Sequence, residues 1–322
     1  MKILLVRLSS MGDLIHTLPA VEDLARQCSE VELHWLCEAG FADIARLHPF
    51  VKKVHVMKWR QWRKHLLQAE TWREIGRLKT DLQAESFDFV LDSQGLIKSA
   101  CFAKMAKSPI YGLDKRSARE SLAALAYGKT FAVPKGKNAV WRNRELFAQV
   151  FGYTMPETQV FGLSVPESGR LKNVQSPYYV ALHATSRDSK LWPVEHWRAL
   201  LKKLNEEQQC NVYLPWGNET EKMRAEQIAS DLPFAFVCDK MNLLQATFLL
   251  KNAEGIIGVD TGLLHLANAL EKPVVGIYTD TDPAKTGVQV SAYAKNLGGI
   301  AQIPNVDEVY QTLMDCVAAY GK

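Results

Sequence analysis

Apolar residues along this chain fall into short blocks, and stretches with helical periodicity separate most of these blocks. The first block, "KILLVRL", and a later one, "FDFVLD", are rich in Val, Ile, Leu and Phe and are bounded by polar residues. Short apolar runs that alternate with helices are typical of buried parallel strands, because helices cover both faces of a parallel sheet. The pattern therefore predicts an α/β protein.

The same pattern places the individual elements in each half of the chain. In the first half it predicts strands at "KILLVRL", "VELHWLCE", "KKVHVM" and "FDFVLD", and helices over about 12–27, 94–106, 116–127 and 138–151. In the second half it predicts strands at "YYVALHA", "CNVYLPWG", "FAFVC", "EGIIGVD" and "PVVGIY", and helices near 193–207, 219–230, 242–252 and 261–270. An amphipathic helix over about 305–319 closes the chain.

A segment without helical periodicity separates the two series of elements. Residues 153–177, "YTMPETQVFGLSVPESGRLKNVQSP", contain three prolines, which favours a linker. We expect one Rossmann-like domain over 1–155, a linker over 156–176 and a second over 177–322, and leave open whether the last helix packs back on the first domain. Ligands of doubly wound sheets bind beyond the carboxyl ends of the strands, so we expect the two domains to face a central cleft.

Composition excludes several classes of protein. No uncharged apolar run reaches about 18 residues, which argues against a transmembrane helix. Arg7 and Asp13 interrupt the apolar start of the chain, which argues against a signal peptide. The six cysteines are scattered and form no CxxC pair, so we expect reduced thiols in a cytoplasmic protein. Neither GxGxxG nor GxxxxGK[ST] follows a predicted strand, which disfavours nicotinamide chemistry and P-loop NTP hydrolysis.

Charge is distributed unevenly between the two halves. Residues 1–160 contain 24 Lys and Arg against 17 Asp and Glu, whereas residues 161–322 contain 15 against 18. This asymmetry either reflects ordinary surface variation or indicates that the first half binds an anionic molecule.

A turn rich in polar residues follows the first strand. In "RLSSMGDLIHTLP", Gly12 permits a tight turn, Ser9 or Ser10 can cap the next helix, and Asp13 lies in its first turn. Asp13 either complements the helix dipole or accepts a proton from a substrate hydroxyl at the edge of the cleft.

Two turns in the second half have the residue types of phosphate sites. In "HATSRDSKLWP", Thr185, Ser186, Arg187 and Lys190 lie between a strand and a helix. In "GVDTGLLHLANAL", Asp260 and Thr261 end a strand, Gly262 starts a helix, and His265 falls on the same side of that helix. Ordinary loop capping and a buried core histidine are the simpler explanations of these two motifs.

A basic segment with interleaved tryptophans lies in the first half. In "VMKWRQWRKHLL", Arg60, Arg63 and Lys64 accompany Trp59 and Trp62, and "KRSARES" adds Arg119 and its neighbours. Such mixtures bind phosphates, sugar acids, nucleic acids or membrane surfaces, or form a solvated helix face. No nucleic-acid-binding motif accompanies the segment, so we expect no nucleic-acid partner.

One further motif is an acidic loop. "TDTDP", residues 279–283, contains a DxD sequence, which in some glycosyltransferases holds a metal ion. It follows a strand and runs into a proline, so we interpret it as loop capping and expect no essential metal.

Taken in order, "SSMGDLIHTLPA", "DSQGLIKSA", "HATSRDSKLWP", "LPWG" and "VDTGLLHL" resemble the lipopolysaccharide heptosyltransferase family, which are inverting glycosyltransferases of the GT-B type. The loop "HATSRDSKLWP" together with "WRK" and "SARES" is similar to the type I enzymes. The resemblance implies transfer of heptose from ADP-L-glycero-β-D-manno-heptose to the inner Kdo of Kdo2-lipid A, at the cytoplasmic face of the inner membrane. It implies no cofactor, no metal and no obligatory protein partner.

The resemblance also implies roles for individual residues. Asp13 would be the general base, and Lys190 would stabilise the leaving diphosphate. The donor site would comprise Thr185, Ser186, Lys190, Glu221, Met241, Asp260, Thr261, Gly262 and His265. From the excess positive charge of the first half, we expect an acceptor site that comprises Arg60, Arg63, Lys64 and Arg119, together with Ser10.

Three other functions stay open on the sequence alone. These are a heptosyltransferase with a different acceptor, a nucleotide-sugar-binding protein without transfer activity, and a sugar-nucleotide epimerase of similar fold. An epimerase would not need the basic, Trp-rich segment.

Overall fold

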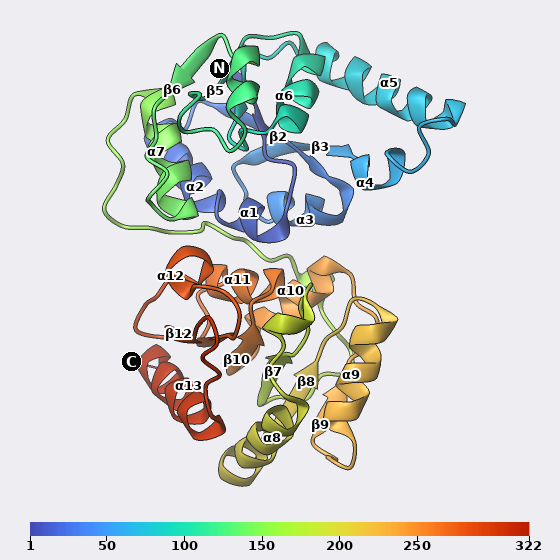
Figure 1. Cartoon of the computed structure of the whole chain (residues 1–322), viewed down its shortest axis with the longest axis vertical. Coiled ribbons are helices and arrows are strands. Elements are labelled where there is room, and N and C mark those ends of the chain that lie inside the picture. The colour runs from blue at the N-terminus through green and yellow to red at the C-terminus, as the bar shows by residue number, and fades with distance from the viewer. Residues whose placement is uncertain (322) are drawn as a thin grey trace. The chain divides into compact units, whose positions relative to one another are not determined.

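Two compact units make up the computed structural model, which describes residues 1–321 (Figure 1). The first unit is Met1–Ser164 and the second begins at Val165. The boundary lies inside the segment 156–176 that the sequence analysis interprets as a linker.

The first unit is a parallel sheet of six strands in the order β3-β2-β1-β4-β5-β6. The strands are β1 (Lys2–Val6), β2 (Glu32–Glu38), β3 (Val51–Met57), β4 (Phe89–Asp92), β5 (Ile110–Leu113) and β6 (Lys129–Phe131). The helices are α1 (Met11–Ile15), α2 (Leu18–Gln27), α3 (Ala42–Arg46), α4 (Trp59–Trp62), α5 (Ala69–Ala84), α6 (Ile97–Ala103) and α7 (Ala139–Phe151), with short 3₁₀ turns at Ala39–Phe41, Lys104–Ala106 and Ser121–Ala126.

The second unit repeats this topology with the order β12-β11-β10-β7-β8-β9. The strands are β7 (Tyr178–Leu182), β8 (Asn211–Leu214), β9 (Ala235–Val237), β10 (Gly255–Val259), β11 (Val274–Tyr278) and β12 (Ala294–Gly298). The helices are α8 (Val194–Gln208), α9 (Glu219–Ala229), α10 (Leu243–Lys251), α11 (Gly262–Ala269), α12 (Pro283–Thr286) and α13 (Val306–Tyr320), with 3₁₀ turns at Glu167–Gly169 and Asp188–Lys190.

The strand order fixes where ligands bind in each unit. In the first unit the chain reverses its direction of winding between β1 and β4, and in the second between β7 and β10. The crevice at such a reversal, beyond the carboxyl ends of the strands, is the usual ligand site of this architecture. The segments that follow β1, β4, β7 and β10 are therefore the expected ligand-binding segments.

Several predicted elements differ from the structure. The helix expected over 12–27 is divided into α1 and α2, with Pro19 in the first turn of the second. The helix expected over 116–127 is only a 3₁₀ turn, because backbone bonds from this segment go elsewhere: the Glu120 N–H donates to the Gly95 carbonyl. Helix α5 and the strands β5, β6 and β12 were not predicted.

Each unit has its own hydrophobic core. In the first, Leu4 and Val6 of β1 pack with Val90, Phe102 and Trp62. In the second, residues of β7, β8, β10 and β11 pack with helices α8 and α9, and α13 packs on α8 and on three strands of the same unit. Within residues 1–321, no helix combines the length and apolar character needed to cross a bilayer.

Candidate functional site

The first candidate group surrounds Asp13, at the start of α1. This helix begins directly after the loop that follows β1, with Ser10 at its N-cap. The Asp13 carboxylate accepts hydrogen bonds from the Ser10 N–H at 2.7 Å and from the Ser10 hydroxyl at 3.0 Å. Its other oxygen accepts from Nη2 of Arg7 at 3.1 Å. Asp13 is thus held on two sides, while 29% of its side chain stays exposed.

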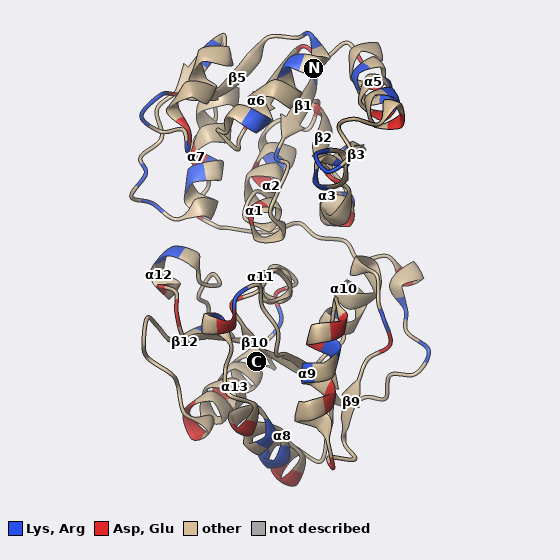
Figure 2. Cartoon of the chain, turned by 45° about the vertical axis from the view of Figure 1, so that its right-hand side comes forward, with Lys and Arg blue, Asp and Glu red and all other residues tan. Residues whose placement is uncertain are grey.

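A cavity of about 430 Å³ opens beside Asp13. Its lining residues come from the segments after β1, β4 and β5 and from the region of α7, which lie far apart in the sequence. Basic side chains line it: Arg7, Arg119, Lys135 and Arg142. Figure 2 shows Lys and Arg positions on α7 and on the loops near it. The cavity therefore has one carboxylate among several cations, which suits an anionic ligand with a reactive hydroxyl.

Asp13 stays ionised in this environment. Burial alone would raise the pKa of its carboxyl, but the Arg7 cation and the two hydrogen bonds from Ser10 outweigh burial and hold that pKa below its usual value. The carboxylate can therefore accept a proton throughout the physiological pH range.

The loop after β4 supports the same cavity. The buried Asp92 carboxylate accepts hydrogen bonds from the backbone N–H groups of Gln94 and Gly95, and also from the hydroxyls of Ser99 and Tyr127. Gln94 in turn accepts from the Leu8 N–H and donates to the Ser9 carbonyl. This network joins the loops after β1 and β4.

The second candidate group lies at the reversal point of the second unit. Here the Lys190 ammonium donates to Oδ2 of Asp260 at 2.6 Å, and the Thr281 hydroxyl donates to the same oxygen at 2.9 Å. Oδ1 of Asp260 lies 3.9 Å from Nε2 of His265. The Thr185 hydroxyl donates to the Asp260 carbonyl at 2.6 Å, so the loops after β7 and β10 are joined.

The Asp260 carboxylate is ionised and therefore negatively charged at neutral pH. Burial would raise the pKa of its carboxyl, but bonds from His265, Lys190 and Thr281 lower that pKa to about 2. The Lys190 side chain, 14% exposed, is therefore kept in place by a permanent counter-charge. The helix α11 starts immediately after Asp260, so backbone N–H groups at its first turn are close to the same site.

The comparisons with known proteins show the family of this chain. The family model described as glycosyltransferase family 9 (heptosyltransferase) matches residues 75–317. The chain belongs to glycosyltransferase family 9. It is 39% identical to lipopolysaccharide heptosyltransferase 1 of Escherichia coli K12, over 92% of each chain, and 40% identical to the Pseudomonas aeruginosa protein of the same name, over 89% of this chain and 81% of that one. The solved structure of E. coli heptosyltransferase WaaC with ADP superimposes with a TM-score of 0.92 at 35% identity, covering 98% of this chain and all of that one.

The resemblance to heptosyltransferases is thereby confirmed, as is the two-sheet α/β fold of the GT-B type. The chain is a glycosyltransferase by family. The roles of individual residues stay predictions, and the structure bears on them only through position.

Three predicted acceptor residues lie outside the cavity. Arg60, Arg63 and Lys64 belong to α4 and the turn after it, and none of them lines the 430 Å³ cavity. The Arg60 guanidinium lies 4.8 Å from the ring centre of Phe41, and its backbone N–H donates to Glu38. Of the five predicted acceptor residues, Arg119 lines the cavity and Ser10 binds Asp13.

The two tryptophans of the basic segment pack against the core of the first unit. Trp62 is 3% exposed, stacks on Phe102 with ring centres 6.5 Å apart, and donates its indole N–H to Glu74. Trp59 packs edge-on against the same Phe102 ring. Trp62 therefore lies in the core, where its indole cannot reach a lipid surface.

The remaining predicted donor residues differ in how they are placed. Thr261 occupies the N-cap position of α11 and Gly262 is the first residue of that helix, so both adjoin Asp260. Glu221 accepts hydrogen bonds from the Gly217 N–H and the Asn218 amide, which organises the start of α9. Ser186 is exposed, and within residues 1–321 neither it nor Met241 forms a hydrogen bond or ion pair.

Sequence reasoning missed several residues of these groups. In the first unit they are Arg7, Ser93, Gln94, Ser117, Lys135, Arg142 and Asn143. In the second unit, Thr281 of the acidic loop contacts Asp260. Asp282 of that loop caps α12, as the sequence predicts. A signal did exist for Arg7, because a cation directly after an apolar strand is costly to bury without a partner.

Proposed function

We propose that this chain is an inverting lipopolysaccharide heptosyltransferase of type 1, which transfers L-glycero-D-manno-heptose from ADP-heptose to the inner Kdo of Kdo2-lipid A. The curated relatives at 39–40% identity carry this name, and the similar solved structures are described with ADP and with ADP-2-deoxy-2-fluoro heptose. The donor is therefore a nucleotide sugar that contains a diphosphate.

The observation that carries the acceptor assignment is the cavity beside Asp13. Among its lining residues in the described part of the chain, Asp13 alone is acidic, and Arg7, Arg119, Lys135 and Arg142 are basic. Kdo has a carboxylate close to its hydroxyl groups, so the cations attract the sugar acid and Asp13 meets a hydroxyl. A neutral acceptor would leave the positive charges that line the cavity without a compensating negative charge.

The reaction proceeds by direct displacement. A Kdo hydroxyl attacks the anomeric carbon of the heptose, and the bond from that carbon to the diphosphate oxygen breaks. Asp13 takes the proton of the attacking hydroxyl, and ADP leaves with the electron pair of the broken bond. Attack opposite to the leaving group inverts the anomeric centre.

The leaving diphosphate needs positive charge. In this proposal Lys190 supplies it, the backbone N–H groups at the start of α11 donate to the phosphate oxygens, and the Thr185 hydroxyl keeps its bond to the Asp260 carbonyl. Asp260 positions the Lys190 ammonium, at 2.6 Å, before the donor binds. The carboxylates of the acidic loop have other partners, since Asp280 accepts from the Ser189 hydroxyl and Asp282 caps α12. This arrangement favours a reaction that needs no metal ion.

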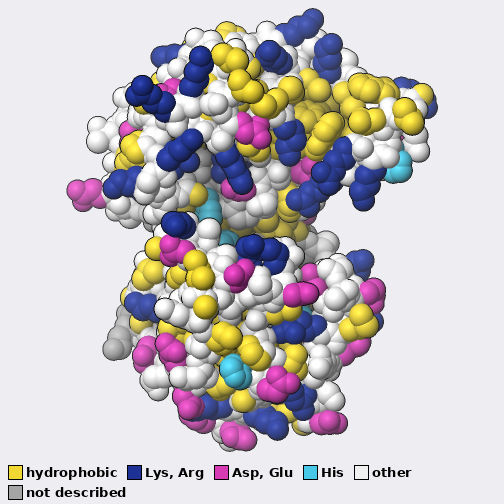
Figure 3. All heavy atoms as spheres, in the orientation of Figure 1, with side chains coloured by type: hydrophobic (Ala, Val, Ile, Leu, Met, Phe, Trp, Pro, Cys, Tyr) yellow, Lys and Arg dark blue, Asp and Glu magenta, His cyan; other side chains and the backbone are white. Residues whose placement is uncertain are grey.

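We further propose that the protein acts in the cytoplasm, at the surface of the inner membrane. Between α4 and α5, Leu66 is 40% exposed and Leu67 is fully exposed, and Trp72 in the first turn of α5 is 59% exposed. Arg63 and Lys64 lie just before Leu66 in the sequence. Figure 3 shows exposed apolar and basic side chains on the first unit, and such a combination binds anionic lipid surfaces. These exposed side chains, together with Arg63 and Lys64, form the membrane-binding surface in this proposal.

One incubation tests the proposal. Purified protein is mixed with ADP-heptose, with and without Kdo2-lipid A, and the release of ADP and the mass of the acceptor are measured. Release that requires Kdo2-lipid A, with one heptose added, supports the proposal. Release only with a different, already heptosylated core would indicate another acceptor. Donor consumption without acceptor would indicate epimerase or hydrolase chemistry, and binding without turnover would indicate a binding protein.

A further inference from the structure

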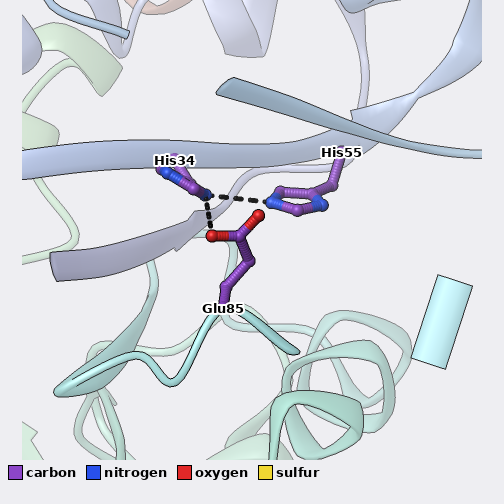
Figure 4. Close-up of side chains that lie close together, drawn as sticks. All are labelled: His34, His55 and Glu85. Carbon is purple, nitrogen blue, oxygen red and sulfur yellow. Dashed lines mark hydrogen bonds and ion pairs between the residues drawn. The ribbon is translucent and has the colours of Figure 1, made fainter. Parts of the chain in front are cut away.

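A cluster of metal-ligating side chains lies in the first unit, outside the groups described above. His34 comes from β2, His55 from the neighbouring β3, and Glu85 directly follows α5 (Figure 4). One ligand atom from each lies within 4.8 Å of the others. Nδ1 of His34 is 3.0 Å from Nε2 of His55 and 3.9 Å from Oε2 of Glu85. Two imidazole nitrogens and a carboxylate oxygen therefore converge on one point.

The outer nitrogen of His34 has a carboxylate partner. Nε2 of His34 lies 3.0 Å from Oε1 of Glu32, so this nitrogen carries the proton and donates it to Glu32. The lone pair of Nδ1 then points toward His55 and Glu85. A carboxylate on the far nitrogen of a histidine is the usual second contact of metal-bound imidazoles, because it fixes the tautomer and increases the basicity of the ligand.

The cluster is enclosed by apolar and basic groups. His34 and His55 are 2% and 5% exposed, and the Phe87 ring packs edge-on against both, with ring centres 5.3 and 6.0 Å away. The ammonium groups of Lys2 and Lys53 donate to Glu85 at 2.9 and 2.5 Å. The opening is at these lysines, since the Lys53 side chain is 52% exposed.

We propose that His34, His55 and Glu85 form a site for a divalent transition-metal ion of the zinc class. Imidazole nitrogens select such ions over Mg²⁺ and Ca²⁺, and a ligand set of two nitrogens and one carboxylate leaves a position for water. On binding, His55 moves its proton from Nε2 to Nδ1, so that the lone pairs of both histidines face the ion and no net proton is lost. Lys2 leaves Oε2 of Glu85 and keeps its second partner, Glu32, at 3.1 Å.

The site is separate from the proposed chemistry. His34 lies beside Leu4 at the middle of β1, and Lys2, which donates to Glu85, begins that strand, whereas Asp13 follows the strand's carboxyl end. The cluster therefore lies nearer the amino end of β1, and the cavity lies beyond its carboxyl end. An ion there joins β2, β3 and the end of α5, so we expect it to stabilise the first unit and to leave turnover unchanged.

The test measures binding of Zn²⁺ and Co²⁺ to the full chain by titration calorimetry and by cobalt absorption. All variants carry Cys101→Ser, because Cys101 is exposed and a thiol would compete for the ion. We expect one saturable ion per chain and a higher melting temperature with Zn²⁺. His55→Ala should abolish this binding, Glu32→Gln should weaken it by about 10–100-fold, and His65→Ala, an exposed histidine outside the cluster, should leave it unchanged.

One variant distinguishes a built site from a chance cluster. Lys53→Met removes an ammonium that repels the ion and competes for Glu85, so it should bind Zn²⁺ more tightly than the parent. If His55→Ala does not fold by circular dichroism, His55→Gln and Glu85→Gln replace it in the series. Absence of saturable binding in the parent, or binding that survives every change at His55 and Glu85, overturns the proposal.

Discussion

The change Asp13→Asn separates the role of the carboxylate in proton transfer from its role in the structure. An Asn side chain keeps the size and one acceptor oxygen, which can still receive the Ser10 N–H that Asp13 now receives at 2.7 Å. It has no charge and cannot take a proton from the acceptor. We expect kcat to fall by about 10²–10⁴, equivalent to about 2.7–5.4 kcal/mol of barrier. The affinity for ADP should stay unchanged.

The same change also costs stability, and the structure sets the size of that cost. Removing one partner of a fully buried ion pair costs about 3–5 kcal/mol. The Asp13 side chain is 29% exposed, and Arg7 keeps a second bond of 2.6 Å to the Ser93 carbonyl. We therefore expect a smaller loss of about 1–2 kcal/mol, or a few degrees in melting temperature.

A second ion pair of the first unit supplies the matched control. Asp23 and Arg144 bond at 2.6 Å, their side chains are 4% and 6% exposed, and neither lines the cavity. Asp23→Asn should therefore destabilise the unit more than Asp13→Asn, by about 3–5 kcal/mol. Its turnover at a temperature where it is folded should stay near that of the unmodified protein.

The assay follows ADP release with ADP-heptose and Kdo2-lipid A, and circular dichroism measures melting on the same samples. We expect opposite rankings of the two variants: Asp13→Asn has the lower turnover, and Asp23→Asn has the lower stability. Near-normal turnover of Asp13→Asn would refute its role as the base. Equal loss of turnover in both variants would show that the effect comes from weakened folding.

Four further outcomes test other parts of the proposal. Lys190→Ala should weaken ADP binding and lower kcat, since the ammonium meets the diphosphate before and during departure; calorimetry with ADP and steady-state kinetics check both, and unchanged values would remove Lys190 from the site. Arg7→Met should raise the pKa of Asp13, so that kcat/KM begins to fall at a higher pH as the solution is acidified, because a base must be ionised to act; a pH profile identical to that of the parent would contradict this. Arg119→Gln should raise the KM for Kdo2-lipid A more than Arg60→Gln does, with an effect that shrinks as salt rises, and the reverse ranking would place the acceptor at α4. EDTA should leave turnover intact, and a loss that Mg²⁺ alone restores would show that the reaction uses a metal.

Much of the fold was predictable because the strands are short and apolar. "KILLV" and "GIIGV" are buried on both faces, and such runs stand out from the sequence without reference to any partner. The order of the strands was not predictable in the same way. It depends on which strands pair, and β5, β6 and β12, which lie at or next to the sheet edges, are short or polar, so they resemble loops.

The candidate site was predictable only where its residues follow strands directly. Asp13, Lys190 and Asp260 lie in turns after β1, β7 and β10, where the topology requires a ligand crevice. Lys135 and Arg142 lie more than a hundred residues after Asp13, and only the folded unit brings them to the same cavity.

The basic segment shows the converse limit of sequence reasoning. Three cations and two tryptophans within a few residues suggest one binding surface. In the structure, Trp62 points into the core, because its indole N–H donates a hydrogen bond to Glu74 and its ring stacks on Phe102. The cations on the other side of the same short helix stay in solvent, so the segment divides between core and surface.

Each reversal point has one ion pair between an aspartate and a cation, and the two pairs differ in how far the cation can move. Asp13 is paired with Arg7, a buried guanidinium that is tied to the Ser93 carbonyl and cannot follow a ligand. Such a partner holds the Asp13 carboxylate in position and keeps it ionised, so that it can accept a proton. Asp260 is paired with Lys190, a compact ammonium on a flexible stem, which can turn from the carboxylate toward a phosphate oxygen as negative charge grows there. An Arg beside the base and a Lys beside the leaving group therefore match the different requirements of the two sites, and exchanging the two cations, Arg7→Lys or Lys190→Arg, should impair each site even though every charge is kept.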